Sequence, residues 1–252
     1  LHRRHFRWRG ERVKSMQYDQ DTFWQWKSRE NYADVVGQPV KVPISWAAGM
    51  VQAVQNGTEV HAGLSRYLLL SFRETHDKQV WDAVRTRAEQ AVQEALQTDT
   101  LEQCNAGLTT AFWWETNYGG KQRYPQLRAA LQKVVQLAAQ YPLTEAEYGD
   151  YLLMLADIAE SITIEMYEYA RFVVDALRQA ITLSIAEKPD AADLRIAAAI
   201  YKAVRCGWVH PERCTLYADH VMKNVQDPHG PMWKYAVSEQ LRCRELAKMG
   251  LL

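Results

Sequence analysis

The sequence has little of what builds a disulfide scaffold or a collagen-like repeat, and neither sign of charge is in excess. Of its 252 residues, only 4 are cysteine, 12 are glycine and 8 are proline. So few cysteines exclude a disulfide framework and are typical of a reducing compartment. Hydrophobic residues make up 48% and charged residues 24% of the chain, which excludes wholesale disorder. A chain of this length and composition can fold without a disulfide or a metal.

Long apolar runs and common catalytic motifs are also missing. The most apolar stretch, residues 148–164, is interrupted by Asp150, Asp157 and Glu160, so we expect no membrane span. The Gly-Gly-Lys at 119–121 lacks the other residues of a P-loop, and neither G-x-S-x-G nor H-E-x-x-H occurs. The three carboxylates of Glu160, Glu165 and Glu168 are expected to lie on a solvent-exposed face of a helix. We therefore expect no catalytic residues, and the chain is predicted not to be an enzyme.

The formal net charge of zero conceals an uneven distribution. The 30 basic and 30 acidic residues cancel, yet residues 1–14 hold six basic side chains and one acid, Glu11. This N-terminal arm therefore carries a formal charge of +5, and the remaining residues carry −5. Arg-rich, acid-poor N-terminal stretches are typical of mitochondrial presequences. The arm therefore predicts a mitochondrial protein, with the cytoplasm as the alternative location.

Aromatic side chains alternate with the arginines of this arm. The residues expected to bind a partner are Arg3, Arg4, Phe6, Arg7, Trp8, Arg9, Trp24 and Trp26. Aromatic and arginine side chains are enriched at the energetically important positions of protein interfaces. The same pattern can stack on the bases of single-stranded RNA and neutralise its phosphates, or reach lipid headgroups. Other protein subunits are the predicted partners, with RNA and a lipid surface as alternatives.

Nearly all of the chain after Pro43 has helical periodicity. It is clearest in residues 78–97, where apolar side chains recur at steps of three and four. Thr144 and Glu147 have the spacing of a capping box, which marks the start of a helix. The predicted helices cover 44–55, 60–74, 78–97, 101–118, 126–140, 145–161, 165–187, 191–205, 212–225 and 232–249. We predict an all-α fold, with an extended arm and connector over 1–43 and a helical domain over 44–252.

Short turns between these helices are typical of stacked antiparallel helix hairpins, either as an α-solenoid or as an irregular bundle. The hairpin at 193–225, DLRIAAAIYKAVRCGWVHPERCTLYADHVMKNV, combines an Asp-Leu start, small residues, an aromatic, a glycine turn and a second amphipathic helix. It resembles one repeat of the organellar helical-repeat proteins of the octotricopeptide and RAP-associated type. The resemblance implies an organellar protein that binds RNA or serves as a structural subunit. Base-reading residue pairs at fixed repeat positions are absent, which favours the structural role.

A second resemblance involves residues 68–136 together with the same hairpin. These stretches are similar to parts of the unsaturated-uronyl glycoside hydrolases, which form α/α toroids. Those enzymes carry a catalytic Asp before a short apolar run, whereas the matching stretch here, CNAGLTTAFWW, has Asn105 at that place. Because glycoside hydrolysis uses paired carboxyl groups, this departure removes an expected catalytic group. A toroidal hydrolase is the second alternative function.

Cys206, His210 and Cys214 are the residues that best fit a metal hypothesis. Cysteine and histidine bind Zn²⁺, and three residues separate each member of this series from the next. If His210 begins a helix, Cys214 lies one turn further on the same face. His220 lies about 240° around that helix from Cys214 and points away. These are weak zinc candidates; the alternative is two small buried cysteines, a histidine N-cap and a surface histidine, and we expect neither metal nor cofactor.

Taken together, the patterns predict a non-catalytic structural or accessory subunit of a larger protein assembly. Docking would use the aromatic and basic arm and the surface of the helical domain. In such an interface, aromatic side chains fill grooves on a neighbour and arginines form charge-assisted bonds to its carboxylates. An organellar RNA-binding helical-repeat protein is the alternative function.

Overall fold

The computed structural model describes residues 124–140, 142–160, 162, 167–226 and 228–252, together with short pieces between 82 and 104. Its helices are α7 (Tyr124–Gln140), α8 (Glu145–Glu160), α9 (Tyr167–Glu187), α10 (Leu194–Arg205), α11 (Pro211–Lys223) and α12 (Pro231–Lys248). The described part of the chain contains no strand, which confirms the all-α prediction there. The predicted arm and connector, 1–43, and the predicted helices 44–55 and 60–74 lie outside the described residues.

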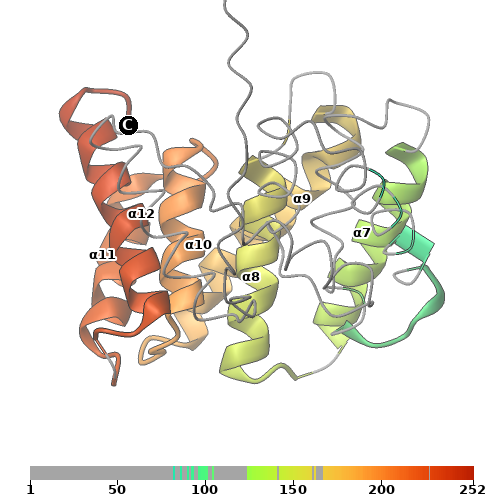
Figure 1. Ribbon diagram of the computed structural model, residues 1–252, viewed down its shortest axis with the longest axis horizontal. Coiled ribbons are helices and arrows are strands. Elements are labelled where there is room, and N and C mark those ends of the chain that lie inside the picture. Colours follow the sequence, from blue (N-terminus) through green and yellow to red (C-terminus); the bar gives the residue numbers. More distant parts are fainter. Residues whose placement is uncertain are drawn as a thin grey trace, which may run out of the picture.

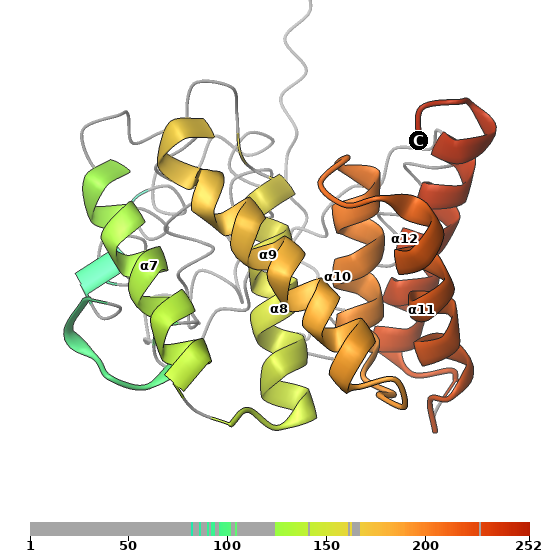
Figure 2. The same ribbon diagram turned by 180° about the vertical axis from the view of Figure 1, so that it is seen from behind.

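The order of the helices in space largely follows their order in the chain. In Figures 1 and 2, α7 lies at one end of the molecule and α11 and α12 lie at the other, with α8, α9 and α10 between them. Helix α10 packs against α8, α11 and α12, while α9 packs against α8, α7 and α11. Helix α7 therefore joins the row through α9, while α11 and α12 join it mainly through α10.

Helix α10 is the most deeply buried element of the described core. Ten of its twelve residues are buried, including the three consecutive alanines 197–199. Alanine has the highest helix propensity and the smallest side chain of the residues that form helices well. Small side chains let neighbouring backbones approach on several sides at once. The composition of α10 thus explains how one short helix packs against three others.

The start of α8 confirms the capping box expected from the sequence. The carboxylate of Glu147 accepts a hydrogen bond from the backbone N–H of Thr144 at 2.8 Å, and the Thr144 hydroxyl oxygen accepts one from the Glu147 N–H at 3.3 Å. These bonds satisfy N–H groups that have no partner within the helix. Because the bond from the Thr144 backbone favours the charged form, the pKa of Glu147 is lowered. Helix α8 therefore begins where the sequence predicts.

Helix α10 begins later than the prediction of residue 191. Its N-cap is Asp193, whose Oδ1 accepts a hydrogen bond of 2.8 Å from the N–H of Arg195. The backbone N–H groups of Ala192 and Asp193 both donate to Glu145 Oε1, at 2.6 and 2.8 Å. The carboxylates of Asp193 and Glu145 thus hold residues 192 and 193 outside the helix. A contact between two distant segments has moved the boundary.

Gly149 marks the place where α8 comes closest to the start of α10. A Cβ atom at this position would lie 2.7 Å from Asp193 Oδ1 and 3.2 Å from the Cβ of Arg195. A separation of 2.7 Å is too short for a carbon and an oxygen that are not bonded. Glycine is therefore required here for packing, because it lets the N-cap of α10 lie directly against α8.

A tight turn at Gly207 joins α10 to α11 and directs the chain into the site described below. Gly207 has φ +72°, and its N–H donates to the carbonyl of Val204 at 2.9 Å. The next N–H, of Trp208, donates to the carbonyl of Ala203, also at 2.9 Å. This pair of bonds defines a Schellman motif, which favours glycine because of its positive φ. Gly207 thus ends α10 at the point that the sequence predicts.

The other predicted ends agree with the structure to within two residues. Pro211 occupies the first turn of α11, where a missing N–H costs nothing. The described part of α9 begins at Tyr167, and α11 ends at Lys223, two residues early. None of the described helices is long and apolar enough to cross a bilayer.

Candidate functional site

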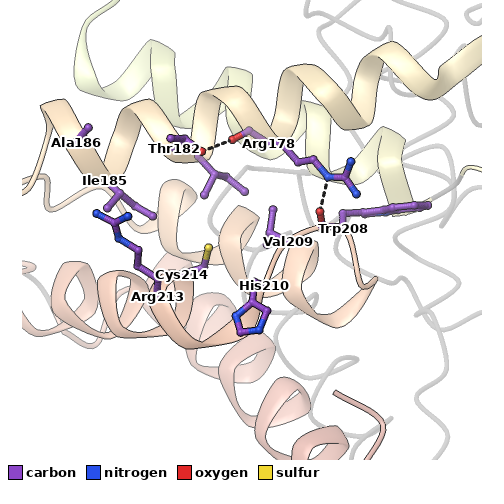
Figure 3. A pocket seen from close by; sticks show the side chains of 10 residues that line it. Arg178, Thr182, Ile185, Ala186, Trp208, Val209, His210, Arg213 and Cys214 are labelled. Carbon is purple, nitrogen blue, oxygen red and sulfur yellow. Dashed lines mark hydrogen bonds between the residues drawn. The ribbon is translucent and has the colours of Figure 1, made fainter.

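A groove of about 490 Å³ lies between α9, the α10–α11 turn and the first turn of α11. Figure 3 shows it from close by. Its described lining consists of the apolar side chains Ile181, Ile185, Ala186, Trp208 and Val209, the basic side chains Arg178, His210 and Arg213, and Thr182 and Cys214. Residues 178, 181, 182 and 185 recur at helical spacing and so lie along one face of α9. Cavities of this volume are large enough to bind a small molecule or a short peptide.

Arg178 lies at the end of the groove that is next to the α10–α11 turn. Its Nε donates a hydrogen bond of 2.6 Å to the carbonyl oxygen of Trp208, which the turn at Gly207 presents to α9 (Figure 3). One of its terminal nitrogens lies 3.7 Å from the carboxylate of Asp175, one turn earlier on α9. These contacts orient the guanidinium group and place it beside the Trp208 side chain.

Arg213 points toward Ile185 at the other end of the groove (Figure 3). Among the described residues, neither Arg213 nor His210 forms a side-chain hydrogen bond or an ion pair, and His210 is an N-cap without a capping bond. The first turn of a helix also carries a partial positive charge. Glu212 lies in the same turn, but neither it nor any other acidic residue is among the described lining residues. The groove is therefore apolar along its length and positively charged at its ends.

Cys214 provides a small buried surface within the groove. Its side chain is 8% exposed, and its sulfur points toward α9 (Figure 3). Burial raises the pKa of the thiol, and the nearby Arg213 offsets only part of that effect. The thiol is therefore protonated at neutral pH, and a protonated thiol is a poor nucleophile and a poor metal ligand. Cys214 contributes packing surface to the groove.

The zinc candidates do not converge on a common point. Cys206 is the C-cap of α10, and the largest effect of its surroundings is burial, which raises its pKa to about 11. The imidazole of His210 points away from α9, whereas the sulfur of Cys214 points toward it (Figure 3). His220, near the other end of α11, lies within 3.0 Å of the side-chain nitrogen of Asn224. Among the described residues, no three His, Cys, Asp or Glu side chains are placed to hold a metal ion.

A buried network of charged side chains connects α8, α10 and α12 beside the groove. Lys202 of α10 is only 3% exposed and forms ion pairs with Asp157 and with Glu160, the latter at 3.1 Å. Arg205, one turn later, pairs with Glu160 at 2.6 Å and with the buried Glu239 of α12 at 3.5 Å. Residues 157 and 160 on α8 have the same three-residue spacing as 202 and 205 on α10. This matched spacing joins the two helices along one face.

The surroundings of Lys202 in this network keep its ammonium group charged. Burial alone would lower the pKa of Lys202, but Asp157, Glu160 and other neighbours outweigh it, and the pKa is well above its usual value. Burial has the opposite effect on the adjacent phenol of Tyr235: it raises the pKa well above normal, so the phenol stays neutral. An ammonium that does not lose its proton cannot act as a nucleophile or a general base near neutral pH. In its charged state Lys202 links α10 to α8 through its two ion pairs.

Glu160 corrects one expectation from the sequence. It was predicted to belong to a solvated face, yet its side chain is only 19% exposed and pairs with both Lys202 and Arg205. The sequence carries a signal for this: Asp157 and Glu160 interrupt the most apolar stretch of the chain. Charges in an apolar stretch require partners of opposite charge. The side chains of Glu165 and Glu168 lie outside the described residues.

A second polar cluster connects α10, α11 and α12. Asp219 accepts hydrogen bonds from the Tyr201 hydroxyl and from the Gln240 amide, and Arg244 lies 3.7 Å from its other oxygen. Burial is the largest cause of the raised pKa of Tyr201, with Asp219 next. The phenol therefore stays neutral and continues to donate its hydrogen bond. Like the Lys202 network, this cluster fixes the relative positions of helices.

The residues predicted to bind a partner lie outside the described part of the chain. Arg3, Arg4, Phe6, Arg7, Trp8, Arg9, Trp24 and Trp26 all precede residue 82, where the described positions begin. Sequence reasoning did not identify the groove, because its walls come from α9 and α11, which are separated along the chain. A single arginine in the first turn of a helix, such as Arg213 four residues after Val209, is too common to mark a site.

The chain matches no protein-family model, no curated protein and no solved structure. The resemblances to octotricopeptide-type repeats and to toroidal glycoside hydrolases therefore stay predictions.

Proposed function

We propose that the protein is a non-catalytic structural or accessory subunit of a larger protein assembly, and that it works in mitochondria. In this proposal the helical domain is a stack of helix hairpins that presents docking surfaces, while the basic and aromatic arm contacts a neighbouring subunit. The observation that carries the proposal is the lining of the α9–α11 groove. Its described residues include two arginines and a histidine but neither aspartate nor glutamate.

This lining supports binding rather than hydrolysis. Glycoside hydrolysis needs two carboxyl groups, one acting as an acid and the other as a base or nucleophile. The carboxylates of Asp157, Glu160 and Glu239, which lie against α10, are held in ion pairs with Lys202 and Arg205. These carboxylates are therefore engaged by cations of the fold and do not line the groove.

The buried cross-links also support a scaffold role. Ion pairs connect α8, α10 and α12, and a second polar cluster connects α10, α11 and α12. Removing one partner of a buried pair is strongly destabilising, so such networks favour one arrangement of the helices. A fixed arrangement reduces the entropy lost when a partner binds. Rigid docking surfaces are what a structural subunit requires.

The native size of the protein tests the proposal. The full-length chain, tagged at its C-terminus and expressed in its own cells, would be fractionated by organelle and then by size exclusion under native conditions. We expect it in the mitochondrial fraction, eluting well above the 29.1 kDa of the chain and together with defined protein partners. Elution as a free monomer contradicts the accessory-subunit proposal. Co-elution with RNA that nuclease treatment abolishes would favour the organellar RNA-binding alternative.

A further inference from the structure

We propose that the α9–α11 groove binds a short, extended peptide segment of a partner protein, in which apolar side chains lie next to acidic ones. The inference rests on the proposed function, since it assigns the chemistry of one docking partner to one surface of this chain. Three features of the groove determine that chemistry: its charge, its apolar walls and its length.

The charge of the groove selects an anionic group. Arg213 has no ion-pair or hydrogen-bond partner among the described residues, and Arg178 is oriented by its bond to the Trp208 carbonyl. Neither aspartate nor glutamate is among the described lining residues, although Asp175, outside the lining, lies 3.7 Å from Arg178. Arginine binds carboxylates through two parallel hydrogen bonds, which gives the pair both strength and direction. An acidic side chain beside Arg213 is therefore the complementary contact.

The walls of the groove select apolar side chains next to that acidic group. Ile185 of α9 faces Val209 and the buried Cys214 across the groove (Figure 3), and Ile181 also lines it. Arg178 and Arg213 lie at opposite ends of these walls (Figure 3). A ligand that reaches both arginines must carry two anionic groups with apolar groups between them. A short peptide segment meets this requirement.

The length of the groove sets the size of the segment. Arg178 and Ala186 are the first and last lining residues of α9, and eight helical steps separate them by about 12 Å. An extended chain advances by about 3.3 Å per residue, so about four residues span this distance. With Arg178 and Arg213 at opposite ends in Figure 3, the acidic side chains of such a segment would lie at its ends.

Nucleic acid fits this surface less well. Bases bind by stacking on aromatic faces, but the groove is walled mainly by aliphatic side chains. Among the described lining residues, Trp208 is the large aromatic side chain, and its indole N–H donates a hydrogen bond of 3.3 Å to the carbonyl of Ala159 in α8. RNA is accordingly tested as the competing occupant.

Selection from a random library of displayed short peptides tests the proposal on the purified full-length protein. The informative variant is Arg213→Glu, because an acidic residue is favourable in the first turn of a helix and should not impair folding. The matched control is Lys234→Glu, which makes the same change of charge on an exposed side chain near the start of α12, outside the groove. Val209→Thr, of equal shape, tests the apolar wall. Circular dichroism and thermal unfolding verify that each variant folds.

We expect the wild-type protein and Lys234→Glu to select peptides in which acidic residues flank apolar ones. Binding of a selected peptide, measured by fluorescence anisotropy, should weaken at least about tenfold in Arg213→Glu and several-fold in Val209→Thr. Library selection on Arg213→Glu should yield basic peptides instead. The proposal is overturned by a selection without consensus, by a basic consensus on the wild type, or by an acidic consensus that neither groove variant affects. It is also overturned if a uridine oligonucleotide, and no acidic peptide, binds in an Arg213-dependent manner.

The outcome is separable from that of the proposed function. A protein that co-elutes with partners but selects no acidic peptide keeps the proposed function and loses this inference. A protein that elutes as a monomer from cells yet selects acidic peptides through Arg213 has a peptide-binding groove without the assembly proposed here.

Discussion

Lys202 is a cation that is almost completely buried within the described part of the chain. Its ammonium is buried between two carboxylates of α8, so its charge is compensated inside the fold and not by water. Burying an ion pair costs desolvation energy that its attraction only partly offsets, so the pair contributes little net stability. Removing one member is different, because it leaves the other charged and buried. The role of Lys202 is therefore to make the arrangement of α8 and α10 specific.

We expect Lys202→Met to lower the free energy of unfolding by about 3 kcal/mol, because Asp157 and Glu160 lose the cation between them. Urea denaturation followed by circular dichroism measures this change. Adding Asp157→Asn to Lys202→Met should restore part of the loss, since one uncompensated charge is then removed. A loss below about 1 kcal/mol for the single variant would show that the pair does not constrain the core.

The buried thiols give the protein a sensitivity to alkaline pH. Burial raises the pKa of Cys243 from its ordinary value of 9.0 to about 11, with smaller effects from Arg205, Glu239, Asp219 and Arg244. Between these values the unfolded chain loses the proton and the folded chain keeps it. Folding stability due to this group is therefore complete below pH 9 and is lost as the pH rises toward 11.

We expect the melting temperature of the wild type to fall between pH 9 and pH 11, and to fall less in Cys243→Ala. A shift of about two pKa units corresponds to roughly 2–3 kcal/mol, which sets the upper limit of the difference. Cys206, whose pKa is also raised to about 11, continues to titrate in the variant and explains a remaining decline. Parallel pH profiles for the two proteins would contradict the assignment.

At the scale of elements, the ends of the helices follow from local chemistry wherever a cap is local. The capping box at Thr144 and the proline at the start of α11 lie where the sequence places them, because each acts within its own helix turn. The start of α10 differs from its prediction by three residues, because Glu145 of α8 binds the N–H groups just before it. Local signals predict local caps, and a partner from another helix can move a boundary.

The glycines that end α10 and α12 provide a matched pair for testing backbone strain. Gly207 and Gly250 have φ of 72° and 69°, and a Cβ at either position would meet no atom within 4 Å. We expect Gly207→Ala to lower the free energy of unfolding by about 1 kcal/mol, the cost of a left-handed conformation for alanine. Gly250→Ala should cost much less, because only two residues follow it and they can rearrange. Chemical denaturation of both variants measures the difference, and equal losses would contradict this explanation.

At the scale of the whole molecule, charge is divided between a basic arm and an acidic remainder. Deleting residues 1–14 removes a formal charge of +5 and removes no residue of the described helices. If the arm docks on protein, we expect the truncated chain to keep its helical circular dichroism while its share in the native assembly falls several-fold. Quantitative immunoblotting of size-exclusion fractions measures this share. An unchanged share contradicts docking by the arm.

The RNA alternative makes a different prediction for the same truncation. Each phosphate neutralised by an arginine or lysine releases counterions, so the logarithm of affinity falls steeply with the logarithm of salt concentration. Titration of a single-stranded oligonucleotide at several salt concentrations should then show a steep slope that decreases on deletion of residues 1–14. A shallow slope, unchanged by the deletion, favours the protein-docking proposal.

The sequence by itself determined the all-helical character of the described chain and most ends of its helices. Both depend on interactions between residues a few positions apart: periodic apolar side chains, a capping box, and glycine and proline at turns. Only the tertiary structure decided that Glu160 is a partly buried partner of Lys202 and Arg205 and that Arg178 and Arg213 share one groove. The physical reason is that these residues are about 35 to 45 positions apart in the sequence, and spacing along the chain does not specify which helices pack together.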